Sequence, residues 1–106
     1  MKKNITLLID TSSNLCTIVG LIIGQQKQTL EDNRRHASQN LLPLIEKILN
    51  ENNLTIHDIN AINVSIGPGS FTGLRVGIAV ANALGTFLGV PINNQDTGKI
   101  AIPKYK

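Results

Sequence analysis

The fold is decided by one stretch of the chain, Ile66-Gly67-Pro68-Gly69-Ser70-Phe71-Thr72-Gly73-Leu74-Arg75. Residues 61–66, which lead into it, alternate apolar and polar side chains, as is typical of a half-buried strand. Residues 74–88, at its other end, are almost all small or apolar over a length typical of a helix. Gly67 and Gly69 permit positive φ and close backbone approach. The stretch therefore predicts a strand, a tight turn and a helix in direct succession.

This glycine-rich turn could also bind an anion, because a strand-to-helix corner presents free backbone N–H groups at the positive end of the helix dipole. It does not match the P-loop pattern, since no lysine follows Gly73. It does not match the dinucleotide pattern either, since Thr72 stands where the third glycine is required. Thr72 is instead the expected N-cap of the helix. A structural turn and an anion-binding loop both remain open.

The rest of the chain predicts an α/β domain with a mixed five-stranded sheet and two main helices. The expected elements follow the order βββαβαβ over residues 5–10, 16–23, 27–31, 38–50, 61–66, 74–88 and 90–93. Short polar connections between the first three strands predict an antiparallel meander. Pro43 is expected near the first turn of the first helix. Thr55 and Asp58 form a capping-box pattern, and Gly89 is expected to end the second helix.

Composition narrows the possible functions. The chain has 106 residues, enough for one domain, and is 42% hydrophobic but only 3% aromatic. Its net charge of +3 and its few aromatic residues do not favour nucleic-acid binding. The single cysteine, Cys16, indicates a reducing compartment such as the cytoplasm. The apolar run at 76–88 is interrupted by polar residues and is shorter than a bilayer span, so no membrane association is expected.

Residues with catalytic potential are few. Asp10 ends the first strand, but one carboxylate does not form a two-metal nuclease site. His36 has Asn40 where a paired metal ligand would stand on a helix. We therefore predict no catalytic residue, no metal and no cofactor. The turn at 10–12 either faces a phosphate or only closes the hairpin, so the candidate cofactor-binding residues are Asp10, Thr11, Ser12, Gly67, Gly69 and Ser70.

The second helix is the strongest candidate for a binding function. It is apolar on all sides, so it must be covered on more than the side that lies on the sheet. Small residues recur every four positions along it and form a ridge that lets another backbone approach closely. Packing on the first helix accounts for part of this surface, and a partner is expected to cover the rest. The candidate interface residues are Leu41, Ile45, Ile48, Leu74, Gly77, Ile78, Ala81 and Gly85.

Three segments resemble, in order and spacing, the motifs of the bacterial TsaB (YeaZ) family. They are Leu7-Leu8-Ile9-Asp10-Thr11-Ser12, the helix at 35–45, and the glycine motif at 67–75. The resemblance runs from about residue 7 to residue 92. It implies a ribonuclease-H-like half-module of the actin-like ATPase superfamily over residues 1–94. Residues 95–106 then form a polar tail that is truncated before the family's third helix, and the family's second domain is absent.

The resemblance also implies a function. TsaB-type proteins are non-catalytic scaffolds that bind the catalytic, TsaD-type subunit which makes threonylcarbamoyladenosine on tRNA. The implied contact is a helix bundle formed with the transferase or with a second copy of the chain, whereas direct tRNA contact is not supported. Two alternatives remain open. One is an actin-like nucleotide-binding enzyme that uses Asp10 and the glycine loop. The other is an inert truncated remnant that only self-associates.

Overall fold

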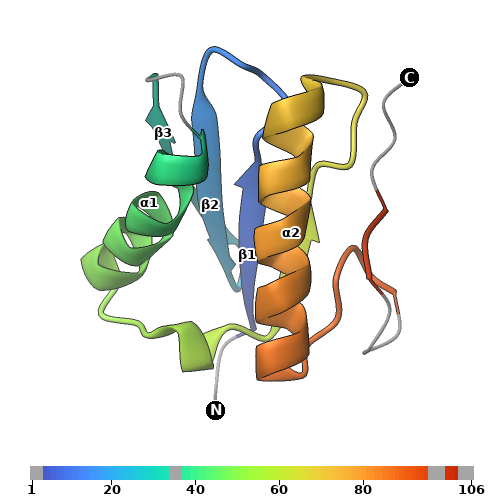
Figure 1. Cartoon of the computed structure of the whole chain (residues 1–106). Helices are drawn as coiled ribbons and strands as arrows, with labels where there is room; N and C mark the ends of the chain where they lie inside the picture. Colours follow the sequence, from blue (N-terminus) through green and yellow to red (C-terminus); the bar gives the residue numbers. More distant parts are fainter. Residues whose placement is uncertain (1–3, 34–36, 96–99, 103–106) are drawn as a thin grey trace.

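The computed structural model describes residues 4–33, 37–95 and 100–102. Four strands form one sheet in the order β3-β2-β1-β4, and two helices lie together on one of its faces (Figure 1). The elements are β1 (Ile5–Asp10), β2 (Thr17–Ile23), β3 (Gln26–Asp32), α1 (Ala37–Glu51), the 3-10 turn η1 (Ile56–Asp58), β4 (Ala61–Val64) and α2 (Phe71–Leu88). The predicted α/β class with a mixed sheet is therefore confirmed.

The sheet combines an antiparallel meander with one parallel pair. β1 pairs antiparallel with β2 from Ile5 opposite Ile23, and β2 pairs antiparallel with β3. β4 pairs parallel with β1, with Thr6 opposite Ala61. A parallel pair needs a long crossover, and the segment that contains α1 supplies it.

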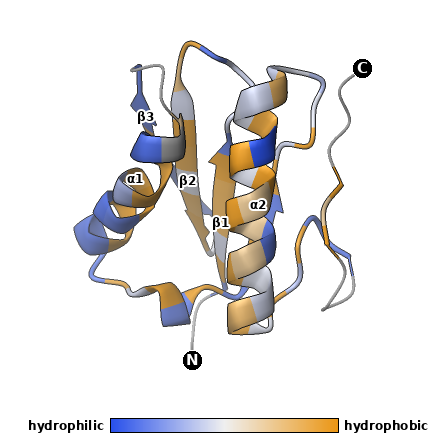
Figure 2. Cartoon of the chain, viewed as in Figure 1, coloured by the Kyte–Doolittle hydropathy of each residue, from blue (hydrophilic) through white to orange (hydrophobic). Residues whose placement is uncertain are grey.

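The core lies between the sheet and the two helices. Ile5, Leu7 and Ile9 are buried, while the alternate residues of β1 are half-exposed. This alternation follows from the two-residue repeat of a strand that has one covered face. α1 contacts β2 and β3, and α2 contacts β1 and β4. In Figure 2 the outer side of α1 is hydrophilic, whereas the visible surface of α2 is apolar or neutral along most of its length.

Two predicted details of the first helix region have different outcomes. The capping box is confirmed, since the backbone N–H of Thr55 donates to Oδ2 of Asp58 at 2.8 Å. Pro43 lies inside α1, beyond the first turn where it was expected. Pro43 removes one helical donor, but Gln39, whose carbonyl loses that partner, is exposed and can bond to water.

The boundaries of α2 correct one prediction. The N-cap is Ser70, whose Oγ accepts from the backbone N–H of Gly73 at 3.3 Å, so the prediction of Thr72 was wrong. The reason is tertiary: the backbone N–H of Ser70 donates to the carbonyl of Ser12 at 2.7 Å, which anchors Ser70 outside the helix. The helix ends as predicted at Gly89, which is left-handed with φ 67° and ψ 39°.

The predicted fifth strand at 90–93 is present only as one parallel bridge, between Ile62 and Ile92. Asn93 explains why the pairing stops. Its side chain accepts from the N–H of Val64 at 2.7 Å and donates to the carbonyl of Val64 at 3.1 Å, so it occupies the positions where a continuing strand would bond. Asn93 and Asn94 both have positive φ, which turns the chain away. The described sheet therefore has four strands, and the ribonuclease-H-like assignment stays a prediction.

Candidate protein-binding site

The turn after β1 is closed by its own side chains. Oδ1 of Asp10 accepts from the backbone N–H of Ser12 at 2.9 Å and from the Ser12 hydroxyl at 2.6 Å. An aspartate that bonds to the backbone two residues further on stabilises a tight turn. One oxygen of Asp10 is therefore already used within the chain.

The same turn contacts the glycine loop that precedes α2. Thr11 is fully buried, and its hydroxyl donates to the carbonyl of Gly73 at 2.6 Å. A Cβ on Gly69 would lie 2.5 Å from the carbonyl oxygen of Ser12, so only glycine fits there. Gly67 has φ +116°, a region that favours glycine. The structure thus packs the turn after β1 against the loop between β4 and α2, which brings the candidate cofactor residues together. Any ligand there stays a prediction.

The ridge of small residues on α2 faces the chain itself. A Cβ on Gly77 would collide with Oγ1 of Thr11 and would lie 3.4 Å from the Ile9 side chain. A Cβ on Gly85 would lie 2.5 Å from Cδ1 of Ile92. The groups that approach this ridge closely are therefore side chains of the chain itself, from the end of β1 and from the segment after α2.

The predicted interface residues accordingly lie in the core. All of them are buried. They are Leu41, Ile45, Ile48, Leu74, Gly77, Ile78, Ala81 and Gly85. They pack between the sheet and the helices, which leaves them little exposed surface for a partner in this fold. That α1 and α2 contact a partner stays a prediction, and other residues of these helices would have to carry the contact.

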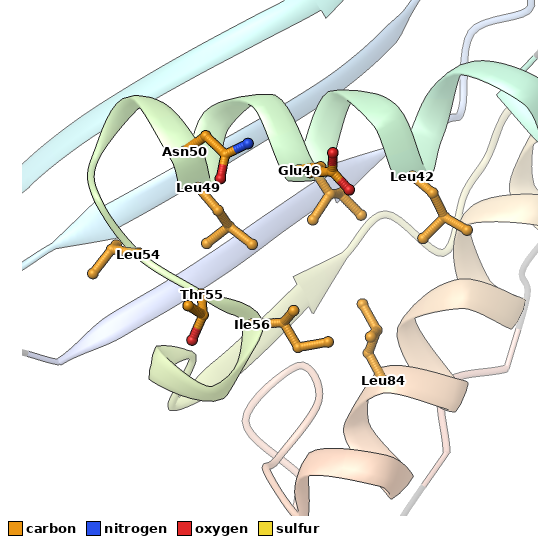
Figure 3. A pocket seen from close by; sticks show the side chains of 9 residues that line it. Leu42, Glu46, Leu49, Asn50, Leu54, Thr55, Ile56 and Leu84 are labelled. Atoms are coloured by element: carbon orange, nitrogen blue, oxygen red, sulfur yellow. The ribbon is translucent and has the colours of Figure 1, made fainter.

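An open apolar groove lies between the two helices. It has a volume of about 550 Å³, and its apolar walls come from α1, from η1 and the segment before it, and from α2 (Figure 3). The lining residues are Leu42, Ile45, Glu46, Leu49, Asn50, Leu54, Thr55, Ile56 and Leu84. Leu42 is 58% exposed on the α1 side. Of the predicted interface residues, only Ile45 lines this groove.

Exposed apolar surface continues beyond the groove along α2. Phe87 is 70% exposed, and its ring lies 6.1 Å, centroid to centroid, from the ring of the exposed residue His57. Ala79 and Ala83 are also exposed, on the outer side of α2. Small residues there let a neighbouring helix approach closely. The surface formed by the groove, Phe87 and these alanines is hereafter the helical face.

Sequence reasoning missed Leu42, Leu84 and Phe87 for a definable reason. Leu41 and Leu42 are adjacent leucines on one helix, yet Leu41 is 1% exposed and Leu42 is 58% exposed. The helical period alone does not separate them. The signal that was available is that a helix apolar on all sides must leave one flank uncovered when it lies on a single sheet.

Other candidate chemistry is sparse in the described part of the chain. No group of three or more His, Cys, Asp or Glu residues is arranged there to hold a metal ion. Cys16 is half-buried and free. His36 and the preceding arginines lie outside the described residues. α2 is long and apolar enough to cross a bilayer by length and composition alone, but a core helix passes the same test, and one side of α2 packs on the sheet.

Comparison with known proteins gives the chain a family. The model of the family "TsaD: tRNA N6-adenosine threonylcarbamoyltransferase" matches residues 23–94. The chain is 35% identical over 91 residues to the tRNA threonylcarbamoyladenosine biosynthesis protein TsaB of Haemophilus influenzae, a match that covers 85% of this chain and 39% of that protein. It is 33% identical over 102 residues to TsaB of Buchnera aphidicola subsp. Schizaphis graminum, with coverage of 96% and 49%.

Solved structures agree with this assignment. YeaZ from Pseudomonas aeruginosa superposes with a TM-score of 0.79 at 29% identity, covering 84% of this chain and 43% of that one. The chain thus spans less than half the length of each of these relatives. The family model, the curated relatives and the shared fold all agree, and the chain therefore belongs to the TsaB (YeaZ) proteins within the TsaD family.

Proposed function

We propose that this chain is a non-catalytic scaffold in the formation of threonylcarbamoyladenosine on tRNA, and that it binds a TsaD-type transferase in the cytoplasm through the helical face. The relatives are named as threonylcarbamoyladenosine biosynthesis proteins, which supports the pathway. The observation that supports the surface is the open groove between α1 and α2, with Leu42 and Phe87 exposed beside it. In this proposal the transferase supplies the catalytic site and the contact with tRNA.

The helical face has the properties of a helix-binding surface. Apolar side chains from two helices line a trough, and an amphipathic helix binds such a trough through residues spaced three or four apart. Covering Leu42, Leu84 and Phe87 would bury apolar area worth about 1 kcal/mol or more for each side chain. The exposed carboxylate of Glu46 at the edge of the groove would add a preference for partners with a basic residue opposite it.

A charge-introducing variant tests the surface. Leu42→Glu places a carboxylate in the groove, and we expect it to weaken binding of a TsaD-type transferase at least about tenfold, since an unpaired charge would be desolvated. Leu15→Glu is the matched control, because Leu15 is 59% exposed but does not line the groove. Isothermal titration calorimetry of both variants with the transferase measures the difference. Equal affinities for the two variants would contradict the helical face as the binding surface.

The two alternatives give different results in the same set of measurements. An actin-like nucleotide enzyme would bind ATP, and Asp10→Ala and Ser70→Ala would abolish that binding while leaving transferase affinity unchanged. A remnant that only self-associates would bind no transferase, and Leu42→Glu would then change only its own sedimentation behaviour. Sedimentation velocity of the chain alone, together with ATP titrations, separates these cases from the scaffold.

A further inference from the structure

Asn82 is the only polar side chain in the middle of helix α2, between Arg75 and Thr86. Asn82 uses both ends of its amide on a single residue that lies 19 positions further along the chain. Its Nδ2 donates to the carbonyl of Ala101 at 3.1 Å, and its Oδ1 accepts from the backbone N–H of Ala101 at 2.7 Å. The two hydrogen bonds satisfy both backbone groups of that residue, as an adjacent strand would.

Among residues 100–102, the described part of the segment that carries Ala101, only the middle residue is buried. Ala101 is 4% exposed and belongs to the hydrophobic core, whereas its neighbours Ile100 and Ile102 are 56% and 70% exposed. Only the small middle residue therefore enters the site. Asn82 bonds only to the backbone of Ala101, so these bonds do not depend on the side chain at position 101. The site requires only that this side chain be small, because it is buried.

This site is separate from the groove between the helices. Asn82 and Leu84 differ by two positions, a rotation of about 200° around a helix axis. Leu84 lines the groove toward α1, and Asn82 therefore lies on the other flank of α2, where Figure 1 shows residues 100–102 (red) beside the helix. The two hydrogen bonds give this segment a defined position away from the groove.

We propose that Asn82 is the centre of a peptide-backbone binding site on α2, whose ligand is an extended segment with a small central residue. Residues 100–102 of this chain fill the site in cis. The clamp holds residues 100–102 on this flank of α2, away from the groove of the helical face.

Amide hydrogen exchange of the full chain, followed by NMR, tests the proposal. We expect the Ala101 amide to exchange at least about tenfold more slowly than a random-coil amide. Asn82→Leu, which keeps the branching at Cγ but has no hydrogen-bonding group, should bring Ala101 to the random-coil rate and leave the amides of α2 protected. Asn14→Leu, at an exposed asparagine outside the helices and the groove, is the control and should change neither.

A second variant tests the size limit from the other partner. Ala101→Leu should release the segment because the buried site has no room for the larger side chain. A synthetic peptide with the sequence of residues 97–106, added to this variant, should then shift the Asn82 side-chain amide signals. The same peptide should not bind to the Asn82→Leu, Ala101→Leu double variant.

Either of two results would overturn the proposal. The first is random-coil exchange of Ala101 in the unmodified chain. The second is unchanged protection of Ala101 in Asn82→Leu with α2 intact. If Asn82→Leu also exposes the α2 amides, the Ala101→Leu variant decides between the outcomes. Fast exchange of the amide at position 101 in that variant, with the α2 amides still protected, supports the clamp. Retained protection of the amide at position 101 overturns it.

Discussion

Replacing Gly77 by alanine should destabilise this protein, although alanine is the better helix former. The new Cβ would collide with Oγ1 of the buried residue Thr11. Overpacking of this kind costs about 1–3 kcal/mol. Moving Thr11 also weakens its hydrogen bond to Gly73, worth about 1 kcal/mol. The helix propensity of alanine offsets about 1 kcal/mol, which leaves a net loss of about 1–3 kcal/mol in the free energy of unfolding.

A double-mutant cycle isolates the collision. In a Thr11→Ala background the colliding oxygen is absent, and the nearest remaining atoms, the Cβ of residue 11 and Cγ2 of Ile9, would lie 3.3 and 3.4 Å from the new Cβ. Gly77→Ala should then be neutral or stabilising by up to about 1 kcal/mol. Gly73→Ala is the matched control, because its new Cβ would meet the backbone carbonyl oxygen of Thr11, which truncation does not remove.

Urea denaturation followed by far-UV circular dichroism measures all these variants. The coupling free energy between positions 11 and 77 should be about 2 kcal/mol. For the control pair, Gly73→Ala should lower the free energy of unfolding by the same amount with and without Thr11→Ala, so the coupling between positions 11 and 73 should be small. An equal cost of Gly77→Ala with and without the Thr11 hydroxyl would refute the view that this ridge exists for contact with the β1 turn.

Three further predictions concern the two ends of α2. Gly69→Val should lower the free energy of unfolding by about 1–3 kcal/mol, because the new Cβ would lie 2.5 Å from the Ser12 carbonyl oxygen, and chemical denaturation would show it. Ser70→Ala should cost only about 1 kcal/mol, the value of an N-cap, and should leave transferase affinity unchanged in a titration. Asn93→Ala should be less stable than Asn93→Gly by about 1 kcal/mol in thermal unfolding, because both lose the bonds to Val64 but only alanine is strained at φ 53°.

Local features of the chain could be predicted because their causes are local. The alternation of apolar residues in β1 gave its buried face, and the spacing of Thr55 and Asp58 gave the capping box. The glycine-rich corner was predicted as well. Its N-cap was not, because a hydrogen bond from Ser70 to a residue 58 positions earlier decides where the helix begins.

The candidate interface shows the limit of the same reasoning. Periodicity identified α1 and α2 as the apolar helices, but it assigned to a partner the residues that the chain itself covers. The fifth strand failed for a related reason, since the Asn93 side chain takes the hydrogen bonds that a longer strand would make.

The sequence by itself determined the order of the elements from β1 to α2, the family and the presence of a helix too apolar to remain uncovered. Only the tertiary structure decided which side of that helix faces the sheet. When a helix is apolar on all sides, its hydropathy pattern does not indicate which side faces the sheet. The rotation of the helix about its axis is then set by the shapes of its side chains. Gly77 in the ridge leaves room for Thr11 and Ile9, and this contact places Leu84 at the groove and leaves Phe87 exposed.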